Sequence, residues 1–364
     1  MLYRLMTKKH KNRHVTSADK MLKLDITLEI RYFDFQNFYN NEYLMFLALL
    51  EDKHFGKLDP KTVFRLANSN AEFSNLWLVH SIRSDCSIKE LALAVAANIH
   101  WDTPAIKSLE QYIEIKSDIA TELDSKTEEA IAYSKEIIND FSLSRQRQLL
   151  SKLQAMTDYI STPDLIGCNK YTHNMPFKIE QLSNIITSCA PLLKDVSLFG
   201  GEGKNSKNEN IRNNSHFPTP LPNDSMALAL LENLLAKSAG IPIKFAEPPV
   251  VLKYLPGQYY QWHYDHIYPH TESIAQHISQ FGQRVKTAIF YLNDDFTGGE
   301  TEFKTPLITV KPTINKVLVF NNCDQDQSRD VSSIHRGKSV TAGEKWIVTL
   351  WFRNKPFWLR SGLL

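Results

Sequence analysis

After Gly240 the pattern of the chain changes to period two and to runs of β-branched and aromatic residues, which form short segments separated by turn residues. The segments are rich in β-branched and aromatic side chains, which favour strands. They are Val250–Tyr254, Thr287–Leu292, Glu300–Phe303, Leu307–Val310, Lys316–Phe320 and Trp346–Phe352. Turn residues such as Pro256-Gly257, Asn293–Asp295, Thr297–Gly299 and Ala342-Gly343 lie between them. Many short strands joined by such turns predict a β-sandwich or a jelly roll.

The part before residue 160 has a different pattern, with apolar side chains at the three- and four-residue spacing of helices. A capping box predicts a helix that starts after Ser87, with Glu90 completing the box, and Thr103-Pro104 predicts another helix start. The expected helical ranges are Tyr43–Leu50, Thr62–Ala67, Ser87–Ile99, Ala105–Ile119, Ser125–Ile138 and Ser142–Ile160. We therefore expect an α-helical N-terminal region, which is either a docking surface for a protein partner or a cap on the following domain.

The residues between these two patterns contain several turn signals. Residues 161–176 include a Ser-Thr-Pro and an Asn-Met-Pro sequence, which predict a linker or long loop. Helices are predicted at Phe177–Leu193 and at Asn223–Ala239. The glycine-rich stretch Gly200–Asn210 lacks the Gly-Lys-Ser/Thr of a phosphate loop, so a mobile surface loop or active-site flap is expected. For a chain of 364 residues we expect two domains, a helical one at residues 1–165 and a β-rich one at residues 175–364.

Composition excludes several classes of protein. The formal net charge is only +2, so no strongly charged partner such as a nucleic acid is implied. No stretch approaches 18 apolar residues, and the N-terminal basic residues are not followed by the apolar run of a secretory signal. The four cysteines are scattered, which fits a reduced cytosolic chain better than a zinc knuckle or a disulfide scaffold. We therefore expect a cytoplasmic protein without a membrane partner.

Three side chains have the residue types of a metal site. His263 and Asp265 are separated by one residue, and on a strand such side chains point to the same face, so both can reach one metal ion. A third ligand must come from a distant strand, and His335 fits this requirement. Two histidines and one carboxylate form a facial triad, which binds non-haem Fe(II) and leaves positions open for a co-substrate and O₂. A lone His-x-Asp is a weak signal in a chain with 12 histidines, and we interpret the neighbours His266, His270 and His277 as solvated.

Two further residues fit a carboxylate co-substrate. Lys345 follows His335 at a spacing that puts one strand between them, which places its ammonium near the open metal positions. Tyr254 is expected to start the strand that leads into the metal motif, and it can donate its hydroxyl to the same carboxylate. Taken alone, Lys345 is equally well explained as a lysine on a strand edge, and Tyr254 as a core residue.

The stretch from about Glu247 to Phe352 resembles the catalytic domain of the 2-oxoglutarate- and Fe(II)-dependent dioxygenases of the prolyl 4-hydroxylase type. The motifs that carry this resemblance, in the order and spacing of the family, are Tyr254, Gly257-Gln-Tyr-Tyr260, His263-Tyr-Asp265, Arg284-Val-Lys-Thr287, Tyr291-Leu-Asn293, Gly298-Gly-Glu-Thr-Glu-Phe303, Val310-Lys-Pro312, Phe320-Asn-Asn322, His335 and Gly343-Glu-Lys345-Trp346. One departure is Asn315, where the family often has glycine, but asparagine tolerates a left-handed turn. The first 160 residues do not resemble the family.

The resemblance implies an α+β fold, with a double-stranded β-helix (jelly-roll) core and flanking helices after the helical N-terminal domain. It implies that His263, Asp265 and His335 bind iron. It also implies residues around 2-oxoglutarate: Lys345 at the C5 carboxylate, Tyr254 and Thr287 assisting it, and Tyr260 and Trp351 lining the pocket. Arg212 loosely resembles the family's substrate-side arginine, and a surface arginine is the alternative. Fe(II), 2-oxoglutarate and O₂ are the implied cofactor and co-substrates, and ascorbate is an accessory cofactor that the resemblance allows.

The expected function is that of an oxidoreductase: a dioxygenase that hydroxylates an unactivated C–H bond while 2-oxoglutarate is decarboxylated to succinate. By resemblance the expected substrate is a prolyl residue of a protein or peptide, and the alternative is a free amino acid or small metabolite. Two other classes stay open, an oxygenase fold that serves as a protein-binding module and a zinc hydrolase that uses the same ligands. The triad together with Lys345 argues against the module. The hydrolase lacks a general base and leaves Lys345 without a role.

Overall fold

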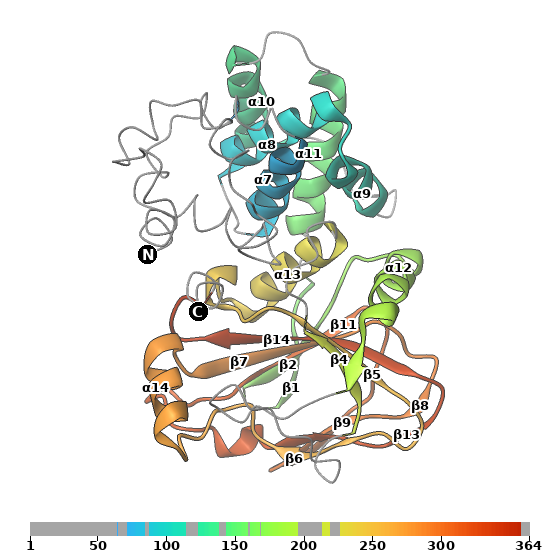
Figure 1. The fold of residues 1–364 in the computed structure, drawn as a ribbon, viewed down its shortest axis with the longest axis vertical. Helices are drawn as coiled ribbons and strands as arrows, with labels where there is room; N and C mark the ends of the chain where they lie inside the picture. The colour runs from blue at the N-terminus through green and yellow to red at the C-terminus, as the bar shows by residue number, and fades with distance from the viewer. Residues whose placement is uncertain are drawn as a thin grey trace, which may run out of the picture. The chain divides into compact units, whose positions relative to one another are not determined.

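The structure is a computed structural model that describes Phe64 and residues 71–83, 87–113, 123–137, 143–158, 161–167, 169–195, 213–218 and 226–357. The chain divides into two compact units, a helical unit that comprises residues up to Met156 and Leu221–Leu230, and a sheet unit that comprises Thr157–Pro220 and Leu231–Trp358 (Figure 1). The helices predicted at Tyr43–Leu50 and Thr62–Ala67 and the flap predicted at Gly200–Asn210 fall wholly or largely outside the described residues.

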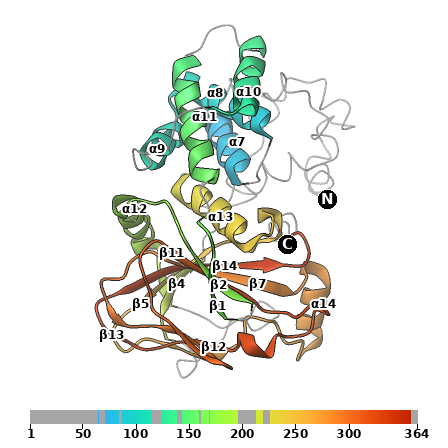
Figure 2. The same cartoon turned by 180° about the vertical axis from the view of Figure 1, so that it is seen from behind.

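The described part of the helical unit contains a bundle of helices around a buried central one (Figure 2). The helices are α7 (Ala71–Arg83), α8 (Ile88–Trp101), α9 (Pro104–Tyr112), α10 (Ser125–Ile137) and α11 (Leu143–Asp158). Helix α8 is the central one, since every residue from Ala92 to Ile99 is buried. No described helix is both long enough and apolar enough to cross a membrane.

The predicted helix starts are found where the caps were expected. Glu90 N donates to Ser87 Oγ over 3.4 Å and Ser87 N donates to a Glu90 carboxylate oxygen over 3.0 Å, which is the predicted capping box. Thr103 caps α9 ahead of Pro104, also as predicted. The predicted end of α9 at Ile119 is wrong, because the helix already ends at Tyr112.

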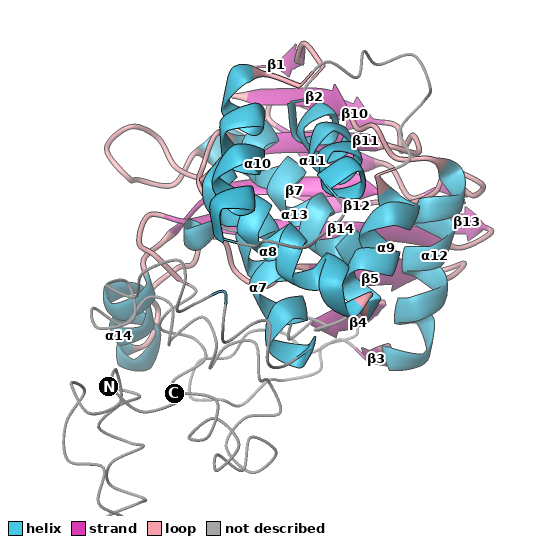
Figure 3. Ribbon diagram, turned by 90° about the horizontal axis from the view of Figure 1, so that it is seen from above, coloured by secondary structure: helices cyan, strands magenta, loops and turns pink. Residues whose placement is uncertain are grey.

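The sheet unit contains two antiparallel sheets that share one apolar core, with helices outside them. The strands of the large sheet, in sheet order, are β1 (Asp164–Gly167), β2 (Lys170–Asn174), β11 (Lys316–Asn321), β7 (Arg284–Tyr291), β14 (Lys345–Arg353), β5 (Val250–Tyr254), β4 (Ser215–Pro218) and β3 (Lys194–Asp195), an order that can be followed in Figure 3. The strands of the small sheet are β10 (Leu307–Val310), β9 (Thr301–Lys304), β12 (His335–Gly337) and β6 (Tyr260–His263). The short strands β8 (Thr297–Gly298) and β13 (Val340–Ala342) form a separate pair.

The core between the sheets is built from alternate residues of strands on both sides. Its buried members include Leu252, Ile289, Phe303, Phe320 and Ile347, which come from β5, β7, β9, β11 and β14. Alternation places every second side chain of a strand in this core, and β7, β11 and β14 are buried on their other face as well, which explains why their sequences are runs of β-branched and aromatic residues. The strands at Val250–Tyr254 and Leu307–Val310 are found with the predicted bounds, and β7, β9, β11 and β14 lie close to theirs.

The remaining helices of the sheet unit lie outside the core. They are α12 (Ile179–Cys189), α13 (Met226–Ala239), whose first turn belongs to the helical unit, and α14 (Glu272–Phe281), with short 3₁₀ turns η2 (Ala190–Leu192), η3 (Ile243–Phe245) and η4 (Val331–Ser333). The end of α13 is tied to the large sheet, because Tyr171 Oη donates to Ser238 O over 2.9 Å and Lys286 Nζ donates to Ala239 O over 2.7 Å. Helix α13 agrees with the predicted range over its described residues, whereas α12 is shorter than the predicted Phe177–Leu193, because it begins at Ile179 and ends at Cys189.

The linker predicted at residues 161–176 is wrong. These residues form β1 and β2, and β2 pairs with β11 inside the large sheet. Asn169 has a positive φ of 59° and turns the chain between the two strands, whereas the Ser-Thr-Pro and Asn-Met-Pro sequences that suggested a linker lie at the two ends of the hairpin. A segment far upstream of its partner strand β11 therefore extends the large sheet.

Candidate active site

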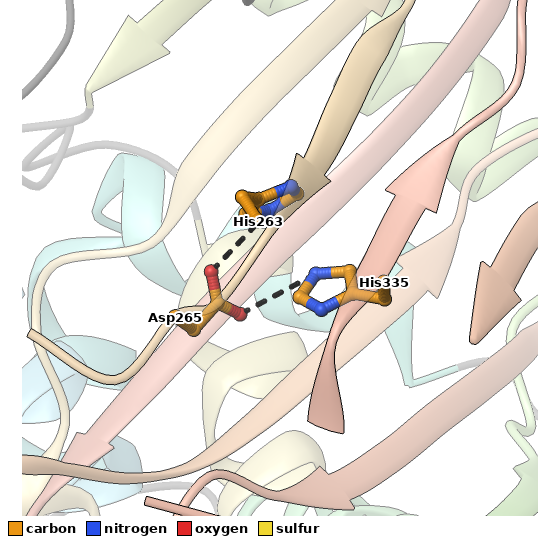
Figure 4. A group of neighbouring side chains, drawn as sticks. All are labelled: His263, Asp265 and His335. Atoms are coloured by element: carbon orange, nitrogen blue, oxygen red, sulfur yellow. Dashed lines mark ion pairs between the residues drawn. The ribbon is translucent and has the colours of Figure 1, made fainter. Parts of the chain in front are cut away.

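The structure brings the three predicted metal ligands together. His263 ends β6 and His335 begins β12, and the two residues pair directly across the small sheet. The ligand atoms of His263, His335 and Asp265 all lie within 4.8 Å of one another. His263 Nε2 is 3.7 Å from Asp265 Oδ1, and His335 Nε2 is 3.8 Å from Asp265 Oδ2, so both rings face the carboxylate (Figure 4).

Asp265 does not lie on the strand from which its orientation was predicted. Strand β6 ends at His263, so Asp265 belongs to the turn that follows. The backbone of this turn is clamped by Gln283, whose Oε1 accepts from Ile267 N and whose Nε2 donates to Ile267 O, each over 2.8 Å. The carboxylate thus reaches the histidines because a turn is held in place, and not because strand alternation continues.

Each histidine is held so that its Nε2 is available to a metal. His263 Nδ1 is 2.7 Å from Gln261 O and His335 Nδ1 is 2.9 Å from Ser333 O. A carbonyl oxygen only accepts, so each Nδ1 is the donor, and in the neutral form of the ring Nε2 is the unprotonated nitrogen that faces Asp265. This donor set fits a divalent metal ion, and two histidines with one carboxylate are the ligands of non-haem Fe(II).

The Asp265 carboxylate is ionised in its buried position. Burial alone would raise its pKa, but the nearby His335, His263 and Arg284 and a hydrogen bond from Thr287 hold the pKa below its ordinary value. An ionised, buried carboxylate whose neighbours include two metal-ligating side chains favours a cation at this point.

Lys345 and Tyr254 also lie together, but the prediction that Tyr254 starts the strand of His263 is wrong, because Tyr254 ends β5 and His263 belongs to β6. Lys345 and Tyr254 are directly paired across β14 and β5, and Lys345 Nζ lies 5.1 Å from the centre of the Tyr254 ring. Lys345 is only 2% exposed, and its Nζ donates to Gly299 O over 2.6 Å. Burial lowers the pKa of the ammonium to about 8, although Glu300 acts in the opposite direction. A buried ammonium is stabilised by an anionic partner, so this residue is suited to a ligand carboxylate.

Tyr260, Trp351 and Thr287 lie around the triad. The Tyr260 ring stacks on His263, with ring centres 3.5 Å apart. Trp351 is the cross-strand neighbour of Thr287. The Thr287 hydroxyl donates to Asp265 Oδ2 over 2.7 Å, so its proton is directed at a metal ligand, and its expected contact with the 2-oxoglutarate carboxylate stays a prediction.

Arg212 lies outside the described residues. The described residue next to it, Asn213, contacts the residue that precedes β6, because its Oδ1 accepts from Tyr259 N over 2.9 Å. This places the start of β4 beside the start of β6, and the assignment of Arg212 to the substrate stays a prediction.

Arg284 is a site neighbour that the sequence patterns do not single out. It pairs with Glu247 through two hydrogen bonds of 2.5 and 2.7 Å, and its guanidinium lies 4.0 Å from the centre of the Trp351 ring. Its charge also acts on Asp265 and Tyr260. Arg284 is part of the Arg-x-x-Thr motif, so the sequence could have indicated it, but the resemblance was used to assign a role to Thr287 alone.

Tyr291 is a second such residue. It is fully buried, its ring centre lies 5.9 Å from Lys345 Nζ, and its hydroxyl is 3.0 Å from Thr301 Oγ1. Burial raises the pKa of this phenol, so it stays protonated and can donate a hydrogen bond beside the Lys345 ammonium. The Tyr-Leu-Asn motif contained it, but a core residue and a site residue look alike in such a strand.

Comparisons with known proteins agree with the geometry. The family model described as the 2OG-Fe(II) oxygenase superfamily matches residues 249–353. A protein named "Putative prolyl 4-hydroxylase" from Acanthamoeba polyphaga mimivirus is 32% identical over 188 residues, which cover 51% of this chain and 76% of the relative. Prolyl 4-hydroxylase 1 of Arabidopsis thaliana is 32% identical over 168 residues, which cover 42% of this chain and 57% of the relative.

Among solved structures, the viral collagen prolyl hydroxylase vCPH from Paramecium Bursaria Chlorella virus-1, in its 2OG complex, is similar to this chain. The match has 21% sequence identity and a TM-score of 0.40, and it covers 51% of this chain and 97% of the viral protein.

Proposed function

This chain belongs to the 2OG-Fe(II) oxygenase superfamily, and within it to the prolyl 4-hydroxylase type, and on that premise we propose that it hydroxylates a prolyl residue of a protein or peptide. It is a 2-oxoglutarate-dependent dioxygenase that uses Fe(II), 2-oxoglutarate and O₂. The observation that carries the proposal is the placement of His263, Asp265 and His335 around one point, with the buried ammonium of Lys345 in the same core. A free amino acid or a small metabolite is the alternative substrate.

The proposed roles divide the site into a metal part and a co-substrate part. His263, Asp265 and His335 hold Fe(II), which supplies the oxidising chemistry when it is bound together with 2-oxoglutarate and O₂. Lys345 binds the far carboxylate of 2-oxoglutarate, with Tyr254 and the phenol of Tyr291 beside it. In the overall reaction one oxygen atom of O₂ enters succinate, the other enters the hydroxylated product, and the lost carboxylate leaves as CO₂.

The substrate is proposed to bind beside the 2-oxoglutarate pocket that Tyr260 and Trp351 line, with Arg284 next to Trp351. The Tyr260 ring covers one face of His263. The Trp351 ring forms an aromatic wall, and the Arg284 guanidinium packs on this ring. Aromatic walls exclude water from a site where oxidising chemistry takes place, and they accommodate a compact apolar ring such as that of proline.

The finer architecture is also a proposal. We infer that the two antiparallel sheets form a double-stranded β-helix, which is supported by the single core that strands of both sheets share. The division into a helical domain at residues 1–165 and a catalytic domain at 175–364 is proposed in outline, with β1 and β2 belonging to the catalytic side. The helical domain either binds a protein partner or caps the catalytic domain. A cytoplasmic location and an accessory role of ascorbate stay predictions.

The test of this function is succinate formation from 2-oxoglutarate in the presence of Fe(II) and proline-containing peptides, with mass spectrometry of the peptide. We expect an increase of one oxygen atom on a prolyl residue and no increase on a matched peptide with alanine in its place. His263→Ala should abolish turnover because it removes a metal ligand, whereas His270→Ala, an exposed histidine of the same region, should leave it intact. Oxygen found only on a free amino acid would favour the alternative substrate, and full turnover by His263→Ala would refute the metal assignment.

A further inference from the structure

Asp265 accepts a hydrogen bond from Thr287, which in turn accepts a hydrogen bond from Asn322. Thr287 Oγ1 donates to Asp265 Oδ2 over 2.7 Å, and Asn322 Nδ2 donates to Thr287 Oγ1 over 2.8 Å. Thr287 and Asn322 are both 0% exposed and Asp265 is 6% exposed, so water does not compete for these bonds. The three residues come from three segments: the turn after β6, strand β7 and the residue that follows β11.

The direction of both hydrogen bonds follows from the chemistry of the groups. An ionised carboxylate only accepts, so the single proton of the Thr287 hydroxyl must point to Asp265. The hydroxyl oxygen is then left as an acceptor, and Asn322 must present its NH₂ group to it. The Asn322 backbone is fixed as well, because its N donates to Val285 O over 2.8 Å and its O accepts from Asp330 N over 3.0 Å.

Asp265 needs such support more than the two histidines do. His263 and His335 lie on strands that pair with each other, whereas Asp265 lies past the end of β6 and has no ladder to fix its side chain. Gln283 holds the backbone of the turn through its two hydrogen bonds to Ile267. These bonds do not constrain the side-chain torsions of Asp265, which orient its carboxylate. The bond from Thr287 sets this orientation.

We propose that Thr287 and Asn322 are positioning residues that form a relay, which holds the Asp265 carboxylate in the orientation needed to bind the metal ion. This inference rests on the proposed function, because it presupposes a metal at the triad. It differs from the role that the family resemblance implies for Thr287, since a hydroxyl whose proton is committed to Asp265 has none left for the carboxylate of 2-oxoglutarate.

The experiment measures metal affinity directly, with Co(II) as the probe, no 2-oxoglutarate present, and the visible absorption of the bound ion as the signal. Thr287→Val, which keeps the shape and removes the hydroxyl, should bind Co(II) about 10- to 100-fold more weakly than the native chain. Thr287→Ser restores the donor and should bind close to the native value. The matched control is Thr172→Val, a threonine of the same sheet that is 4% exposed, and it should not change the affinity.

Asn322→Leu tests the second link. It removes the donor to Thr287 without removing the bond to Asp265, so its loss of affinity should be smaller than that of Thr287→Val. The double variant should be no worse than Thr287→Val alone, because members of one network are not additive. Two independent losses that simply add would contradict a relay.

The outcomes separate this inference from the proposed function. If the native chain binds Co(II) and forms succinate, but Thr287→Val binds Co(II) as tightly and only raises the 2-oxoglutarate requirement, the relay is overturned and the role implied by resemblance stands. Melting of the metal-free protein shows whether Thr287→Val folds. If it does not fold, Asn322→Leu is the deciding variant, and a Co(II) affinity equal to that of the native chain in Asn322→Leu overturns the relay. If the native chain neither binds Co(II) nor forms succinate, the proposed function fails first and the relay fails with it.

Discussion

At the scale of single residues, Lys345 shows how the surroundings of a side chain set its chemistry. Its ammonium is buried and its pKa falls to about 8, because removing the charged form from water is costly and Glu300 only partly offsets that cost. The group is therefore mostly cationic at neutral pH but loses its proton within the range where enzymes are commonly assayed.

This gives a prediction for the pH dependence of co-substrate binding. A lowered pKa means that the cation is present below about pH 8 and is lost as the pH rises through that value. Only the cation attracts the carboxylate, so the KM for 2-oxoglutarate should rise by about tenfold per pH unit above the pKa. Lys345→Arg keeps its charge at high pH and should remove this rise. A KM that stays constant across the alkaline range in the native enzyme would show that the ammonium does not contact 2-oxoglutarate.

At the scale of elements, the turn that contains Gly298 and Gly299 sets the place of Lys345. Both glycines have positive φ, 73° and 69°, and Gly299 O accepts from Lys345 Nζ. A Cβ on Gly298 would lie 2.3 Å from Ser339 O, a backbone atom that cannot move without shifting the neighbouring strand β13. The Gly-Gly pair is therefore required by the close approach of two strands as well as by the left-handed backbone.

We expect Gly298→Ala to destabilise the sheet unit more than Gly240→Ala does. Gly240 has a similar φ of 66° at the end of α13, but a Cβ there meets nothing within 4 Å. Gly240→Ala should therefore cost only the left-handed conformation, about 1 kcal/mol, while Gly298→Ala adds a backbone clash. Urea unfolding of the two variants measures this difference through their midpoints, and equal losses would show that the clash is relieved without cost.

At the scale of the whole molecule, the metal site joins segments that are far apart in the chain. The ligands come from the end of β6, from the turn after it and from β12, and all three belong to the sheet unit. A bound ion holds these segments only in the folded state, so the free energy of binding adds to the stability of the sheet unit.

A divalent metal should therefore raise the melting temperature of the sheet unit. At a concentration of 100 times its Kd, a ligand that binds only the folded state adds about 2.7 kcal/mol. The measurement is calorimetry of the metal-free chain with and without added ion, and a chelator should reverse the shift. His263→Ala should lose the shift and His270→Ala should keep it. A shift that persists in His263→Ala would locate the stabilising ion elsewhere in the protein.

Local patterns explain which parts of the fold could be predicted. Helix caps such as the Ser87 box and alternating strands such as β5 depend on neighbouring residues, so they can be recognised in the sequence. Strands β1 and β2 could not, because a short strand between turn residues looks like a linker until a distant partner, here β11, pairs with it. The end of β6 at His263 was equally hidden, since no turn residue follows immediately.

The sequence by itself determined the family, the residue types of the metal site and the lysine for a carboxylate, because order and spacing of the motifs are properties of the chain. Only the tertiary structure decided how Asp265 is held, which residue receives the Thr287 proton, and that Arg284 and Tyr291 lie beside the site. These features depend on hydrogen bonds and contacts between strands that are adjacent in the sheets but distant in the chain. Such pairings are set by long-range packing, which spacing along a sequence does not encode.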